Sequence, residues 1–306
     1  RGQRLEAVGK IRINRFDDRA TSSLPPQPVR VTKDKPVKAF FIDNKAVVPF
    51  AHAYMKPSFE RIHLSSTTGV HLYQARAYPI QFDGTQQTRE KICRLLDQHI
   101  NNVLRIDRDA KIIAFFDMRP SAVWRKNNPQ AALITAAGHQ GPQSYFSPEH
   151  EQMATSELRK TVRYLEDQAY GSRIFAYHLI TCGTPDSVLG GIEDNLFEKN
   201  RAKLTLGDYN PHAISAFQNW LRSRYDSLPA LRKAWHQEQI TFESAAPINK
   251  VLTAVGQDGG VFRDPTAPGV GAMPSDYFEF LSGGVWRFYM KLAAAVKQET
   301  SGRALV

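Results

Sequence analysis

Cysteine is scarce in this sequence of 306 residues, which contains only Cys93 and Cys182. Two cysteines cannot build a disulfide framework or a cysteine-rich metal site. We expect Cys93, on the face of a predicted helix, to be a small core residue. Cys182 has no assignable histidine and asparagine partners that would make it a nucleophile. No spacing of histidine and acidic residues is typical of a metal site, so we expect no metal.

Long apolar runs and nucleotide-binding motifs are also missing. No apolar run approaches the ~20 residues that cross a bilayer, so we expect no membrane partner. No Gly-x-Gly-x-x-Gly follows an early strand and no phosphate-loop pattern occurs, so we expect no nucleotide and no other cofactor. The sequence starts without Met or a signal-like leader, and we expect an N-terminus that is either processed or cut from a longer polypeptide, with the compartment unassigned.

Positive charge is plentiful, with a net charge of +10, and it is concentrated near the start of the chain. Residues 1–38 hold ten Lys or Arg against four acidic residues. Nucleic-acid binding would require interleaved aromatic residues or a known module, and the segment has neither. We interpret it as a solvated basic surface and expect no nucleic-acid partner. Binding of a polyanion by this segment is a weaker alternative.

Strands alternate with helices over most of the chain, which predicts parallel βα units. The predicted strands are apolar runs rich in β-branched and aromatic residues, at 47–54, 70–77, 111–116 and 174–180. One predicted helix covers residues 88–103, and others begin at the capping residues Ser147, Asn210, Ser227 and Ser275. Residues 304–306 look like the start of another strand. An open doubly wound sheet is an alternative, but the pattern favours an incomplete (β/α)8 TIM barrel of four to five units.

The first part of the chain has a different pattern. Alternation over residues 10–16 predicts a half-exposed strand, and residues 22–28 are rich in serine and proline, as linkers are. Residues 38–50 predict a hairpin that turns at Asp43-Asn44. We therefore expect residues 1–33 to be the end of an N-terminal β-domain with a linker. Residues 34–306 are expected to form the N-terminal half of the barrel.

Polar side chains follow the predicted strands at their carboxyl ends, where α/β barrels build their active sites. In chain order they are His52, Gln74, Arg76, Asp117, Arg119 and Asp186. Planar polar groups suit the recognition of sugar hydroxyls. For Asp117 and Arg119, the alternative to sugar binding is an ordinary ion pair at the surface. Trp124 and Tyr78 suit stacking on a sugar ring, although they can equally belong to the core. We expect His178, in the middle of a strand, to be a satisfied core histidine.

An ordered set of residues resembles the β-galactosidase-like glycoside hydrolases, notably glycoside hydrolase family 42 and its uncharacterised relatives. The set begins with Asp208-Tyr209-Asn210-Pro211 and continues with Phe217, Trp220-Leu221, Tyr225, Ser227-Leu228, Leu231, Trp235, Phe242 and Pro247. Phe41-Ile42-Asp43, Phe262-Arg263-Asp264-Pro265 and Asp276-Tyr277 add to it. The resemblance extends over roughly residues 34–306.

The resemblance implies a TIM barrel that hydrolyses glycosidic bonds with retention, using a Glu after the fourth strand as acid/base and another after the seventh as nucleophile. The two carboxyl groups must lie ~5–5.5 Å apart. The sequence departs from the family by having Thr184-Pro185-Asp186 where the family has Asn-Glu or Thr-x-Glu. It also ends as the fifth strand begins. The resemblance places Asp186 at the acid/base position. A loop acid or a helix cap is the alternative, and Glu193 or Asp194 could serve instead.

Two hypotheses follow. The first is a retaining, β-galactosidase-like glycoside hydrolase whose substrate is an oligosaccharide or glycoside, present as a fragment that lacks the nucleophile strand and is inactive alone. The second is a catalytically inactive carbohydrate-binding relative, which Pro185-Asp186 favours. Because half a barrel leaves the edge of its last strand uncovered, we also expect self-association into a homo-oligomer.

Overall fold

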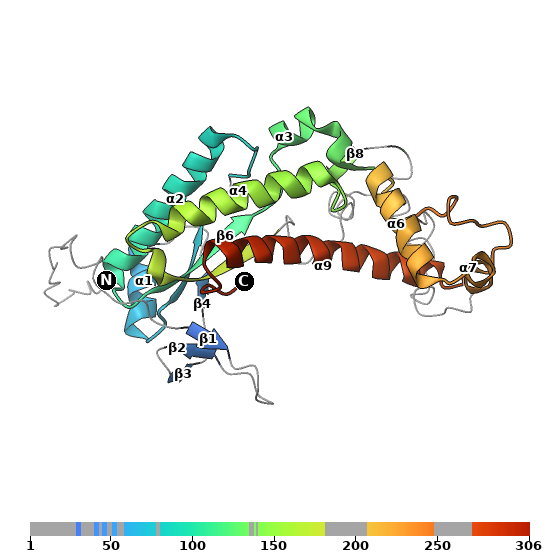
Figure 1. Ribbon diagram of the computed structural model, residues 1–306. Coiled ribbons are helices and arrows are strands. Elements are labelled where there is room, and N and C mark those ends of the chain that lie inside the picture. Colours follow the sequence, from blue (N-terminus) through green and yellow to red (C-terminus); the bar gives the residue numbers. More distant parts are fainter. Residues whose placement is uncertain are drawn as a thin grey trace, which may run out of the picture.

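The computed structural model of the protein is built around one parallel sheet with helices packed on one of its faces (Figure 1). It describes residues 29–31, 40–42, 45–47, 51–53, 58–77, 80–134, 138, 140–180, 207–247 and 271–306. The sheet has the strand order β4-β5-β6-β9. These strands are β4 (Ala51–Ala53), β5 (Leu72–Arg76), β6 (Lys111–Asp117) and β9 (Ile174–Ile180). All three pairings in the sheet are parallel.

A helix connects each strand to the next, and the helices follow one another across the sheet. They are α1 (Phe59–Thr67), α2 (Gln86–Ile106), α4 (Pro148–Glu166) and α9 (Met273–Glu299). In Figure 1, α2, α4 and α9 run alongside one another above the strands. The end of the chain forms a parallel bridge from Leu305 to Ala176 of β9, which confirms the predicted start of another strand. Each strand thus pairs with the next βα unit in chain order, which confirms the α/β class and the partial barrel.

A separate antiparallel sheet precedes the parallel one. It contains β1 (Val29–Val31), β2 (Phe40–Ile42) and β3 (Lys45–Val47), in the order β1-β2-β3. Ile42 pairs with Lys45, which confirms the hairpin around residues 43 and 44. The pairing of β1 with β2 joins residues on both sides of the division proposed at residue 33. The strand predicted over residues 10–16 lies outside the described residues.

The core forms where the helices cover the parallel sheet. Along β5 and β6, every second side chain points toward the helices. These side chains are at most 2% exposed and belong to Tyr73, Ala75, Ile112, Ala114 and Phe116. They pack against apolar residues of the helices, such as Ile92, Leu96, Leu158, Val162 and Phe288. Burying one face of a parallel sheet against helices is the arrangement that βα units require. Cys93 is buried in this layer, as predicted.

A second apolar cluster forms in the long connection between β9 and α9. It joins α6 (Pro211–Arg224), α7 (Leu228–Trp235) and the first turns of α9. Its buried members include Phe217, Leu221, Leu231, Trp235, Tyr277 and Phe280. Phe146 packs against both clusters. The second cluster holds the first turns of α9, and the core on the parallel sheet holds its later turns.

Buried Asp276 fixes the start of α9 against α6 and α7. Its carboxylate accepts hydrogen bonds from the Tyr225 hydroxyl at 2.6 Å and from Trp235 Nε1 at 2.7 Å. Its other oxygen lies 2.9 Å from Nε of Arg224. A carboxylate with no exposed surface needs such partners, because an unpaired buried charge is costly.

Three of the four predicted helix caps are confirmed. Ser147, Asn210 and Ser227 each accept a backbone N–H of the first turn. The prediction that Ser275 caps the last helix is wrong, because α9 begins at Met273, after Ala272. Pro274 suits the first turn with its fixed φ, and the acid at position 276 favours the positive end of the helix dipole, so the helix starts earlier.

The connection from β6 to α4 contains elements that the sequence did not predict. They are α3 (Ala122–Asn127), the short 3-10 helix η2 (Pro129–Ala131), β7 (Ala132–Ile134) and β8 (Gln140–Gln143). Helix α1 and the 3-10 turn η3 (Gly171–Arg173) were not predicted either. Within the described residues, no helix is long and apolar enough to cross a membrane.

We predict opposite effects for alanine at two neighbouring glycines of α9. A Cβ at Gly284 would overlap the Phe146 ring, which is itself stacked on Phe280 at 4.6 Å and cannot yield easily. A Cβ at Gly283 would meet nothing within 4 Å. Gly284→Ala should therefore lower the free energy of unfolding by about 1–3 kcal/mol through overpacking. Gly283→Ala should raise it by about 0.5–1 kcal/mol through helix propensity. Denaturant unfolding of both variants measures this, and equal effects would contradict the close approach of Phe146.

We also predict an acid-dependent loss of stability through His150 of α4. This side chain is fully buried and stacks on Phe288 at 4.8 Å, and burial lowers its pKa to about 4. Below the ordinary pKa of 6.5 the unfolded chain takes up a proton that the folded chain refuses, so stability falls as pH falls toward 4. The contribution is at most about 3 kcal/mol. The free energy of unfolding of His150→Phe should fall less steeply than that of the parent chain between pH 7 and 4. Parallel pH profiles would contradict this.

Candidate functional site

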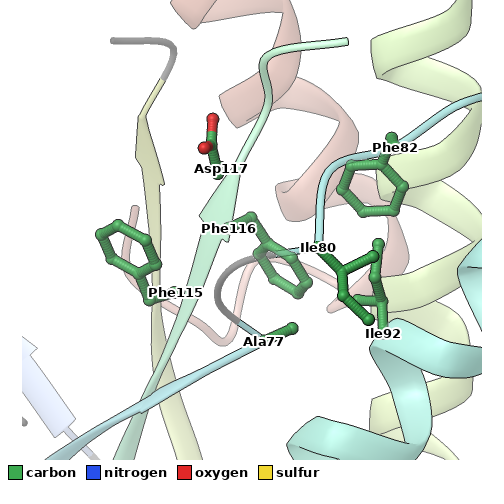
Figure 2. Close-up of a pocket in the computed structure, with 7 residues that line it drawn as sticks. All are labelled: Ala77, Ile80, Phe82, Ile92, Phe115, Phe116 and Asp117. Carbon is green, nitrogen blue, oxygen red and sulfur yellow. The ribbon is translucent and has the colours of Figure 1, made fainter. Parts of the chain in front are cut away.

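The face of the parallel sheet opposite the helices, here called the inner face, carries polar side chains near the carboxyl ends of the strands. Alternation puts Gln74 and Arg76 of β5, Phe115 and Asp117 of β6, and His178 of β9 on this face. In Figure 2, Phe115 and Phe116 project from opposite sides of β6. In barrels, the inner face at the carboxyl ends of the strands is where side chains from different strands meet.

Three of these residues form one row across three strands. Strand register pairs Arg76 with Phe115, and Phe115 with His178. The guanidinium carbon of Arg76 lies 4.4 Å from the centroid of the Phe115 ring. The ring of His178 meets Phe115 edge to face, with centroids 5.1 Å apart. The cation and the imidazole thus flank one aromatic ring.

Gln74 connects the two ends of this row by hydrogen bonds. Its Oε1 accepts a hydrogen bond from Arg76 Nε at 2.6 Å, and its Nε2 lies 2.8 Å from His178 Nδ1. Because an amide nitrogen can only donate, Nδ1 is the acceptor and the ring proton of a neutral His178 lies on Nε2. Gln74 is 6% exposed, and its two hydrogen bonds hold both neighbours in place.

Electrostatics keep the imidazole of this row neutral. Burial among its neighbours, and then the charge of Arg76, lower the pKa of His178. Burial also lowers the pKa of the Arg76 guanidinium. Only a neutral His178 can accept the hydrogen bond from Gln74. The lowered pKa and the hydrogen-bond geometry therefore both indicate a neutral ring.

Asp117 and Arg119 form a closed ion pair just beyond this row. The guanidinium of Arg119 contacts both carboxylate oxygens, at 2.7 to 3.1 Å, and its backbone N–H donates to Oδ1 at 3.0 Å. The side chain of Asp117 is only 10% exposed. A carboxylate held at both oxygens by a guanidinium is fixed in orientation and is suited to positioning other groups.

The structure does not bring every predicted site residue to the inner face. His52 pairs in register with Tyr73 on the helix-covered face, where its Nδ1 bonds the Ser65 hydroxyl of α1. Trp124 lies in α3, is 8% exposed and packs into the core. Asp186, Glu193, Asp194, Cys182 and Tyr78 lie outside the described residues.

His178 is a correction to the sequence prediction. It was expected in the core, yet it lies on the inner face because it alternates with buried Tyr177 and Leu179; its ring is partly covered by Gln74 and Phe115, and the rest of the side chain is exposed. Phe115 was not predicted as a site residue at all. The alternation of side chains between the two faces of each strand could have identified both. Once the register is known, it puts Gln74, Arg76, Phe115 and His178 on one face.

A small pocket lies next to the inner face but is not the site. It is lined by Ala77, Ile80, Phe82, Ile92, Phe115, Phe116 and Asp117 (Figure 2). The lining is apolar except for Asp117, and most of it comes from the helix-covered side. Such a pocket offers no convergent polar groups to orient a ligand.

The residues that carry the family resemblance prove to be structural where they are described. Asp208 accepts a hydrogen bond from the backbone of Asn210 at 3.0 Å, and Asn210 Nδ2 donates to the carbonyls of Gln130 and Ala132 at 2.8 Å. The backbone N–H of Asp208 donates to the hydroxyl oxygen of Tyr277 at 2.7 Å. This segment therefore joins α6 and α9 to the β6–α4 connection.

Comparison with known proteins gives a structural relationship. No protein-family model matches the sequence. No curated protein matches it either. Several solved structures of glycosidases match the fold with TM-scores above 0.5.

The matched structures include β-galactosidases and a β-amylase. The β-galactosidase of the psychrophilic Marinomonas ef1 is 16% identical, with a TM-score of 0.53, over 83% of this chain and 36% of its own. The GH42 β-galactosidase Gan42B of G. stearothermophilus is 11% identical, with a TM-score of 0.54, over 82% of this chain and 34% of its own. The catalytic domain of β-amylase from Paenibacillus polymyxa is 14% identical, with a TM-score of 0.55, over 84% of this chain and 65% of its own.

The chain therefore spans about a third of the length of the β-galactosidases that it matches. At these identities the likeness is one of fold. The chain has the partial TIM-barrel fold of the glycoside hydrolases, including GH42 β-galactosidases.

Proposed function

We propose that this chain supplies the first βα units of a retaining, β-galactosidase-like glycoside hydrolase that acts on β-linked sugars. The observation that carries the proposal is the polar row of Arg76, Phe115 and His178 on the inner face of a sheet whose fold is that of glycosidase barrels. In such barrels the substrate lies over the carboxyl ends of the strands. The sugar and the linkage rest on the resemblance to family 42.

The inner face has the chemistry that sugar recognition requires. Guanidinium, amide and imidazole groups provide hydrogen-bond donors for hydroxyls, and the Phe115 ring holds two of them in fixed orientations. Since Gln74 ties Arg76 to His178, the donors are positioned before a substrate arrives. Preorganised donors lower the cost of binding because less side-chain entropy is lost.

Asp186 is the proposed acid/base. It follows β9, the fourth strand of the parallel sheet, which is where the resemblance places this residue. Asp117, which ends β6, is a poorer candidate because Arg119 holds both of its oxygens. The nucleophile expected from the resemblance follows a seventh strand, so the proposed reaction belongs to a polypeptide that holds both carboxyl groups ~5–5.5 Å apart.

A catalytically inactive carbohydrate-binding relative is the second candidate. Pro185-Asp186 favours it, because the sequence has Asp where the resemblance implies Glu. The two candidates differ only in turnover, and both predict that sugars bind to the inner face.

We predict that Asp186→Asn lowers the hydrolysis of aryl β-galactosides by the complete natural polypeptide about 100- to 10,000-fold, the usual contribution of a general acid. Binding of the same glycosides should change little, because the amide keeps the size of the side chain. Initial rates and binding isotherms measure both quantities.

Glu193→Gln and Asp194→Asn serve as matched controls in the same part of the chain. Each should leave the rate within a few-fold of the parent. Loss of activity in one of the controls, with Asp186→Asn unaffected, would move the acid/base role to that residue. Sugar binding with no measurable turnover in the parent polypeptide would overturn hydrolysis and leave the binding candidate.

A further inference from the structure

A chain of two hydrogen bonds runs across the inner face from a guanidinium to an imidazole ring. It starts at Arg76 of β5, whose Nε donates to Oε1 of Gln74 at 2.6 Å. It continues from Nε2 of the same amide to Nδ1 of His178 on β9, at 2.8 Å. Strand β6 separates β5 from β9, so the chain couples two strands that do not pair with each other.

The guanidinium fixes the direction of this chain. Arginine has hydrogen-bond donors and no acceptor, so the oxygen of the Gln74 amide must face Arg76. The amide nitrogen then faces His178 and can only donate, so Nδ1 must accept and the ring proton lies on Nε2. Turning the amide over would set a donor against a donor at Arg76 and forfeit a charge-assisted hydrogen bond. The cation on β5 therefore determines the tautomer of a ring on β9.

An amide at position 74 is the group that suits both neighbours. It combines one acceptor for the guanidinium with one donor for the imidazole. A carboxylate in its place would only accept, and it would require a proton on Nδ1 of His178. Gln74 is 6% exposed, so its neighbours and not the solvent decide its hydrogen bonds.

We propose that Arg76 and Gln74 are positioning residues that fix His178 as the tautomer with its proton on Nε2, and that His178 donates this hydrogen bond to a hydroxyl oxygen of the sugar. The inference rests on the proposed function and adds the direction of one contact to the substrate. Because Nδ1 is occupied, the ring nitrogen that remains can only donate. A hydroxyl can donate or accept, and the fixed tautomer requires this one to accept.

Solid-state ¹⁵N spectra of the complete natural polypeptide, labelled in its histidine rings, test the tautomer. Protonated and unprotonated ring nitrogens have well-separated shifts, and alkaline pH keeps histidine rings neutral. His178→Phe identifies the signals of this ring by their loss. We expect the tautomer with the proton on Nε2 in about tenfold excess or more, as one oriented hydrogen bond provides.

Two substitutions should move this proton. Gln74→Glu offers only acceptors, so Nδ1 of His178 should become protonated. Arg76→Met removes the group that orients the amide, so both tautomers should appear, although the hydrogen bond of Arg76 goes to the amide and not to the ring. Gln81→Glu is the matched control, because the Gln81 amide contacts Asp117 at 3.3 Å, and it should leave the tautomer unchanged.

A second measurement tests whether His178 meets the sugar. Thiogalactosides resist hydrolysis, and each hydroxyl in turn is replaced by fluorine or by hydrogen. Fluorine accepts a weak hydrogen bond but cannot donate one. At one ring position the fluoro analogue should therefore bind about 2- to 10-fold more tightly than the deoxy analogue. His178→Phe keeps a ring of similar size and should remove this difference at that position alone.

The outcomes separate the hydrogen-bond chain, the sugar contact and the proposed function. A protonated Nδ1 in the parent chain, or a tautomer that both Gln74→Glu and Arg76→Met leave unchanged, would overturn the directed chain. Equal binding of fluoro and deoxy analogues at every position, or a difference that persists in His178→Phe, would overturn the donor role of His178 and leave the glycosidase proposal standing. Failure of the unsubstituted thiogalactoside to bind would overturn the proposed function itself.

Discussion

Side chains alternate between two faces along β5, β6 and β9, and this constraint separates the core of the molecule from its chemistry. One set, which includes Tyr73, Phe116 and Tyr177, is buried under the helices. The other set is left on the inner face, where the parallel register lines up Arg76, Phe115 and His178. The polar row exists because neighbouring strands are in register, and a slip of one residue would send it into the core.

Helix α9 couples the sheet to the long connection that precedes it. Its first turns hold the second cluster through Asp276, and its later turns pack on α4 and β9. Figure 1 shows it extending from α6 and α7 to the sheet. The residues that made the sequence resemble family 42 lie mainly in this second cluster. The resemblance therefore reflects a shared scaffold, whereas the groups suited to binding a sugar lie on the inner face.

The sequence predicted the elements better than it predicted the site. Strands β5, β6 and β9 follow from short apolar runs rich in β-branched and aromatic residues, and Ser147, Asn210 and Ser227 are caps with a local mechanism. Helix α1 was missed because it is short and buries only Ile62 and Ser65, which leaves no apolar stripe in the sequence. His178 was misplaced, and the row with Arg76 went unnoticed, because both depend on the register between strands distant in sequence. Local patterns do not encode that register.

The proposed function requires that the inner face, and no other surface, receives the sugar. A crystal structure of the complete natural polypeptide with a bound glycoside tests this most directly. We expect the sugar to lie over the carboxyl ends of β5, β6 and β9, within hydrogen-bond distance of Arg76 or His178. A sugar bound on the helix-covered side near His52, or away from the parallel sheet altogether, would contradict the account.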